Sequence, residues 1–222
     1  MNQKNYIFII LILIQLNFSL ILNASSPTII TIEEVKTTDD IEMKWAIIHF
    51  DDSKDLDIKV ELYEKLLTSL ENLIPTYSNP SELLIWKAIL LASIAEGKKF
   101  TALFKIQEPI KILKSIVNSN DSDILQGLAK TNLAILKAYV PPADPTSAEK
   151  LFNEVLTKFP NSIDANYNFA EFLEKVDDGK RKKEALDLYK KIITLKPREN
   201  QTYADESLIQ IAKNKVIKLN QK

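Results

Sequence analysis

The spacing of apolar positions predicts helices along most of the chain. From Asp55 onward, apolar residues recur three and four positions apart, as at Ile58, Leu62, Leu66 and Leu70, and do not alternate as they do in a strand. Helices are expected over residues 55–77, 80–95, 106–118, 122–140, 145–158, 163–176 and 203–219, with one more ending before residue 197. The linkers are short, so neighbouring helices should pack antiparallel as hairpins. The predicted fold class is all-α.

Turn and capping residues separate these helices. Pro141 and Pro142 stop one helix, because proline lacks the backbone donor that a helix interior needs. Asp144 and Pro145 then have the identities of an N-cap and a first-turn residue. Ser162 is placed to cap the next helix. Helix boundaries are therefore predicted from side-chain chemistry as well as from periodicity.

Two segments, about 129–162 and 163–199, carry the same pattern of small and bulky residues. A small residue is needed where two helices approach closely, an aromatic ring four residues later fills the space towards the next hairpin, and a proline ends the second helix. The residues that carry this pattern are Tyr139, Ala148, Phe152 and Pro160 in the first segment and Ala170, Ala185, Tyr189 and Pro197 in the second. Alanine and proline have the same separation in both segments.

This pattern resembles the tetratricopeptide repeat, whose period is about 34 residues. The resemblance implies antiparallel hairpins stacked as an α-solenoid over residues 55–222. A degenerate repeat is expected at about 80–120, where Ser115 and Asn120 stand in place of the usual alanine and proline. Because a solenoid usually needs at least three units, the helices at 55–77 and 203–219 are expected to act as caps. An unrelated helical bundle is the alternative.

The chain also resembles a narrower group of exported bacterial tetratricopeptide proteins over most of residues 40–215. The matching stretches are Lys59–Glu71, Ser81–Ser93, Tyr139–Pro141, Asp164–Leu173, Leu195–Arg198 and Tyr203–Glu206. The resemblance implies a periplasmic helical-repeat protein. The chain is more loosely similar to the periplasmic T component of TRAP transporters. It departs from the group in two loops, at residues 95–105 and after Pro141, so any role of those loops in relatives is not carried over.

Residues 1–24 have the order of a secretory signal peptide. Lys4 supplies a positive start, an apolar run follows over residues 6–14, and small residues surround Ala24. We expect cleavage after Ala24 and export to the bacterial periplasm. The alternative is an uncleaved leader that anchors the chain in the inner membrane through residues 6–22. Residues 25–54 are expected to form an N-terminal segment with a short helix.

Composition removes several classes of chemistry. The 222-residue chain has no cysteine and one histidine, so disulfides, zinc–thiolate sites, iron–sulfur clusters and His-pair metal sites are excluded. Its formal net charge is −1, which gives no general attraction to nucleic acid or to anionic lipid. We therefore expect no cofactor, no metal and no nucleic-acid partner, and contact with a membrane only through the leader.

Three features could suggest a site. His49 lies next to Asp51 and Asp52 and could form an acid–base pair, but no nucleophile motif accompanies it, and a structural histidine is favoured. The acidic run over residues 51–57 lacks the spacing of a calcium loop. The basic run Lys180–Lys183 follows two aspartates and is interpreted as a solvated loop. No residue is therefore assigned a catalytic role, and an enzyme is not expected.

First helices of repeats line the concave side of a superhelix. Four polar residues on such helices are candidate ligand contacts: Asn132, Lys137, Asn166 and Asn168. The function predicted from these features is a non-catalytic scaffold that binds a protein or peptide in the periplasm or envelope. One alternative is an accessory of a solute transport system, and an enzyme is a third. The partner and the oligomeric state stay open.

Overall fold

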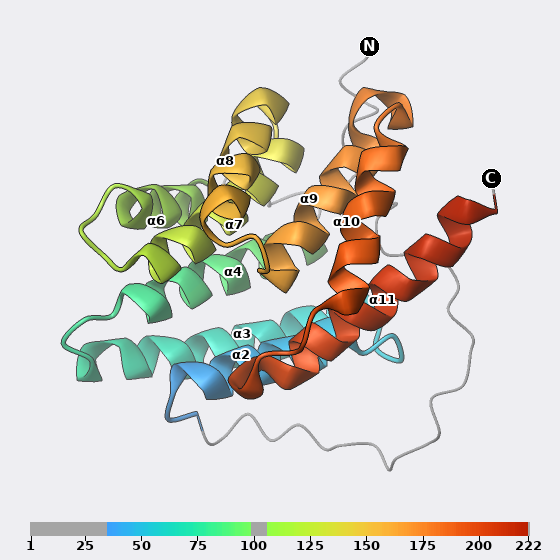
Figure 1. The fold of residues 1–222 in the computed structure, drawn as a ribbon. Helices are drawn as coiled ribbons and strands as arrows, with labels where there is room; N and C mark the ends of the chain where they lie inside the picture. Colours follow the sequence, from blue (N-terminus) through green and yellow to red (C-terminus); the bar gives the residue numbers. More distant parts are fainter. Residues whose placement is uncertain (1–34, 99–105, 222) are drawn as a thin grey trace.

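The computed structural model describes residues 35–98 and 106–221, and every regular element in these ranges is a helix (Figure 1). The α-helices are α2 (Thr38–Phe50), α3 (Leu56–Leu73), α4 (Ser81–Gly97), α6 (Gln107–Val117), α7 (Asp123–Tyr139), α8 (Pro145–Lys158), α9 (Ile163–Lys175), α10 (Lys182–Thr194) and α11 (Thr202–Asn220). Short 3-10 helices are η1 (Ile74–Thr76), η2 (Val176–Gly179) and η3 (Glu199–Gln201). The predicted all-α class is confirmed.

Side-chain caps begin the helices where polar residues precede apolar runs. The side chains of Asp144 and Ser162 accept the backbone N–H groups three residues ahead, at the starts of α8 and α9. Ser122 caps α7 in the same way. Each such cap stabilises a helix by about 1 kcal/mol. Gly179, with φ of 77°, closes the turn before α10 in a conformation that favours glycine.

The helices pair as hairpins. The first helix of each hairpin also contacts the first helix of the next hairpin. α4 packs with α6, α7 with α8 and α9 with α10. In addition α4 contacts α7, α7 contacts α9, and α9 contacts α11 (Figure 1). We call α4, α7, α9 and α11 the helix row. α9 lies inside this row, and none of its residues is fully exposed.

The N-terminal helix α2 brings the two ends of the described chain together. It packs on α3 and α4, and it also contacts α11 and η3 (Figure 1). Phe50, the last residue of α2, packs against the core formed by the later helices. The segment that the sequence set apart as 25–54 therefore contributes an integral helix, and the first described helix is a neighbour of the last.

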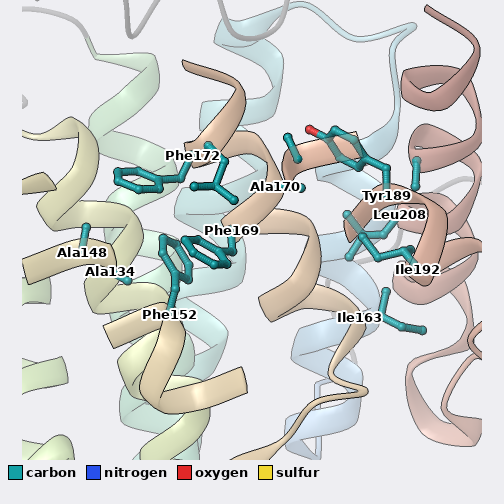
Figure 2. Close-up of a cluster of buried hydrophobic side chains, with 13 residues drawn as sticks. Ala134, Ala148, Phe152, Ile163, Phe169, Ala170, Phe172, Tyr189, Ile192 and Leu208 are labelled. Carbon is teal, nitrogen blue, oxygen red and sulfur yellow. The ribbon is translucent and has the colours of Figure 1, made fainter. Parts of the chain in front are cut away.

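Aromatic rings and alanines form the core between α7 and α11 (Figure 2). The ring of Phe152 stacks on that of Phe169 with centroids 5.3 Å apart and lies 5.9 Å from that of Phe172. Ala148 and Ala185 are completely buried among these rings and their neighbours. Two further clusters join α2, α3 and α4, and α4, α6 and α7. The residues that carry the sequence repeat are thus mostly core residues.

The predicted leader at residues 1–24 and the alternative anchor at 6–22 lie outside the described residues, as do residues 25–34. The departing loop at 95–105 is described only as far as residue 98. Among the described helices, none combines the length and apolar character needed to cross a membrane.

Enlarging a buried alanine tests the close approach of α9 and α10. We expect Ala185→Leu to lower the free energy of unfolding by about 1–3 kcal/mol, because the site is fully buried and extra methylenes force neighbours to move. Lys190→Leu, at an exposed position of the same helix, should change it by less than about 0.5 kcal/mol. Urea unfolding followed by circular dichroism measures both. Equal effects would contradict the packing described here.

Candidate functional site

Polar and aromatic side chains from four helices meet around α9. The group, which we call the tyrosine–charge cluster, consists of Tyr139 on α7; Tyr167, Glu171, Glu174 and Lys175 on α9; Tyr189 on α10; and Lys215 on α11. Tyr167, Glu171 and Glu174 share one face of α9 because successive members are three or four positions apart, and Lys175 follows Glu171 at four positions. The cluster therefore bridges α7 to α11 across the middle of the helix row.

Two carboxylates organise the cluster. The hydroxyl of Tyr189 lies 3.1 Å from Glu171 Oε1 and 3.1 Å from Glu174 Oε2, and donates towards them. Lys215 Nζ lies 2.5 Å from Glu171 Oε1 and 2.8 Å from Glu174 Oε2. Lys175 forms an ion pair with Glu171 on the same helix. Two acids and two bases thus balance one another, and the ion pairs tie α11 to α9.

The tyrosine rings contact the cations as well as each other. Lys175 Nζ lies 5.5 Å from the centroid of the Tyr139 ring, and Lys215 Nζ lies 5.7 Å from that of Tyr189. Both separations are within the range of a cation–π interaction. The rings of Tyr167 and Tyr189 are 6.0 Å apart. The hydroxyl of Tyr139 is buried and has no hydrogen-bond partner among the described residues.

The electrostatics keep Glu171 ionised. Burial acts to raise the pKa of Glu171, but the positive charges of Lys175 and Lys215 outweigh it and hold the pKa at about 2. The pKa of Lys215 is raised, since the two carboxylates outweigh its burial. The side chains keep 15% exposure at Glu171 and 25% at Lys175, so the cluster is partly open to solvent.

The cluster continues towards the N-terminal helices through alternating charges. Burial raises the pKa of Glu96 at the end of α4, while the charges of Lys59 and Lys175 act in the opposite direction. Lys59 Nζ donates to the main-chain oxygen of His49 at 2.8 Å. Charges that influence one another are therefore found on α9 (Lys175), α4 (Glu96) and α3 (Lys59), and Lys59 in turn binds the end of α2.

His49 packs among aromatic side chains. Its ring stacks on that of Trp45 with centroids 4.6 Å apart, and its Nδ1 lies 3.4 Å from the hydroxyl of Tyr63. Burial lowers the pKa of His49 to about 4, so the ring is neutral at physiological pH. Asp51 binds Lys54 at 2.7 Å. The histidine and the aspartate, which the sequence placed side by side, thus have different partners.

The three asparagines proposed as ligand contacts are bound to the main chain. Asn132 and Asn168 donate to the carbonyl four residues earlier, at 3.0 and 2.8 Å. Asn166 is completely buried and donates to the carbonyls of Pro160 at 2.9 Å and Ser162 at 2.6 Å. Asn166 therefore stabilises the turn between α8 and α9 and is not on a surface.

Lys137, the fourth proposed contact, secures the turn after α7. Its Nζ lies 3.0 Å from Asp144 Oδ2, and its main-chain oxygen accepts the N–H of Asp144 at 2.7 Å. Its side chain keeps 26% exposure. The structure thus does not gather the four proposed residues into one site.

Other polar regions contain local pairs. In the basic run, Arg181 binds Glu149 and Glu184. Half of the residues that line a hollow of about 50 Å³ between α7 and α8 are charged, and its lysines Lys130 and Lys158 are paired with Glu154 and Asp123. No group of three or more acidic or histidine side chains in the described part of the chain could hold a metal ion.

Sequence reasoning named Tyr139 and Tyr189 only as packing residues and missed the charged members of the cluster. The spacing of Tyr167, Glu171 and Lys175 on one helical face was a usable signal. Lys215 could not be found in this way, because its approach to Glu171 depends on how α11 packs across α9.

The chain matches no protein-family model, no curated protein and no solved structure. The resemblance to tetratricopeptide proteins therefore depends on the residue pattern alone.

Neutralising Glu171 tests the electrostatic account. Its pKa of about 2 in the fold is below the ordinary 4.5, so its ionised form contributes stability above pH 4.5 that is lost as pH falls towards 2. We expect Glu171→Gln to lower the free energy of unfolding by about 2 kcal/mol at pH 7 and by much less near pH 2.5. Thermal unfolding of both proteins, measured between pH 2.5 and pH 7, checks this prediction. Glu206→Gln, at an exposed position on α11, should have little effect at any pH.

Proposed function

We propose that this protein is a non-catalytic scaffold of the tetratricopeptide type, which binds a protein or peptide partner in the periplasm or envelope. The helix row would act as the frame of a short α-solenoid, and the tyrosine–charge cluster would be the contact surface for the partner. The proposal combines the residue pattern of the two repeats with the order of helix contacts, in which each hairpin touches the next.

The observation that carries the proposal is the composition of the partly exposed cluster. The half-buried Tyr139 and Tyr167 and paired charges of both signs lie where α7, α9 and α11 meet, whereas Tyr189 is completely buried. The side chains of Glu171 and Glu174 keep 15% and 17% exposure. Tyrosine is enriched at protein interfaces because it combines a large apolar ring with a polar end. Charges of both signs give selectivity among partners more than they give affinity.

The histidine and the lysines of the described chain favour a binding function over a catalytic one. The single histidine is neutral and held between Trp45 and Tyr63. The lysines of the cluster are paired with carboxylates and therefore lack the free amine that a nucleophile needs. Affinity and geometry are then the means by which this surface would act.

Site-specific photo-crosslinking tests the proposed surface. A benzophenone amino acid replaces Tyr139, whose hydroxyl has no hydrogen-bond partner among the described residues, or Ile124, which is 72% exposed on α7 away from the cluster. With an envelope extract from the source organism, we expect a discrete crosslinked partner from position 139 and none from position 124. Crosslinks from position 124 alone would contradict the proposed surface.

The leader provides a separate test of location. If residues 1–24 are a cleaved signal peptide, intact-mass measurement of the protein isolated from the envelope should give a chain that begins at Ser25. A full-length mass together with membrane extraction only by detergent would instead support the anchor at residues 6–22. Recovery of the chain in the cytoplasm would contradict both.

A further inference from the structure

Part of the contact between the two ends of the described chain is polar. Glu42 of α2 is buried there, with 7% exposure. Gln201 Nε2 of η3 donates to Glu42 Oε2 at 2.5 Å, and Asn200 Nδ2 lies 3.5 Å from Asp39 Oδ1. We call this contact between α2 and residues 198–205 the polar seam.

The face of α2 that meets α3 and α4 is apolar. Ile41 and Ile48 are completely buried in the cluster formed with these helices. Trp45 lies 5.7 Å from Trp86 between ring centroids, and its Nε1 donates to Ser93 on α4 at 3.2 Å. Burial of these side chains fixes α2 to α3 and α4. If the ends of the chain separate, they therefore separate at the polar seam.

The polar seam has an excess of negative charge. The groups that face Glu42 are Asp164 at the start of α9 and Arg198 and Asp205 beside η3. Arg198 is engaged by Asp205: its Nε and Nη2 donate to the two carboxylate oxygens at 2.9 and 2.7 Å, and its main-chain N–H donates at 2.8 Å. Asp205 itself has no exposure. Among these groups the one cation, Arg198, is already paired with Asp205. No second cation among them balances Glu42 and Asp164.

An ionised Glu42 is therefore poorly compensated in the closed seam. Burial raises the pKa of Glu42 to about 8; the charge of Arg198 lowers it, and those of Asp164 and Asp205 raise it further. Glu42 binds its proton more tightly in the closed seam than in water. By linkage, deprotonation between pH 4.5 and 8 weakens the closed seam progressively as pH rises.

We propose that the polar seam is a proton-operated latch, closed when Glu42 is protonated and opened when it ionises. Opening separates Glu42 from Gln201 and leaves α2 packed on α3 and α4, because its apolar contacts are with those helices.

Spin labels on either side of the seam test the latch directly. The chain has no cysteine, so Met43→Cys together with Glu206→Cys gives two unique labels at exposed positions of α2 and α11. Pulsed electron–electron resonance on the isolated protein should show one short distance at pH 6 and an additional longer one at pH 9. We expect the ratio of open to closed molecules to rise roughly ten- to a hundredfold between these values, and to reverse on return to pH 6.

Matched variants identify the group responsible. Glu42→Gln keeps an oxygen for the hydrogen bond from Gln201 but cannot ionise, so its distances should be the same at pH 6 and pH 9. Glu199→Gln, at an exposed position of the same segment, should respond as the unmodified background does. Unchanged distances in the background at pH 9, or a full response in Glu42→Gln, would overturn the latch.

Discussion

Two helices can approach only as closely as the side chains between them allow, and the small residues around α9 set that distance here. Ala148, Ala170 and Ala185 are completely buried, and each allows a ring from a neighbouring helix to fill the space beside it. Phe152 and Tyr189 occupy corresponding places in successive hairpins. Because the hairpins approach closely on both sides, α9 has no fully exposed residue, and polar side chains such as Asn168, Glu171 and Lys175 bind partners inside the protein.

The two polar regions of the core satisfy that requirement to different degrees. Glu171 has two cations, from α9 and α11, and their attraction exceeds the effect of burial, so its charge stabilises the fold. Glu42 faces a guanidinium that is already bound to Asp205, so burial prevails and the proton stays bound. Both carboxyl groups lose contact with water on folding. Glu171 nevertheless stays ionised at neutral pH, whereas the protonation of Glu42 changes with pH in that range.

This difference relates stability to the proposed function. The tyrosine–charge cluster is held in a fixed arrangement by balanced pairs, and such preorganisation reduces the entropy lost when a partner binds. The polar seam lies at a contact between the first and the last of the described helices.

The sequence by itself determined the helices, their caps and the residues buried between them. Periodicity and caps such as Ser162 are local, because helix formation depends on residues within about one turn. The cluster and the polar seam required tertiary structure. Lys215 lies 44 positions from Glu171, and Gln201 lies 159 positions from Glu42. No local pattern relates positions so far apart; the packing of α11 across α9 and α2 decided which charges were paired and which were not.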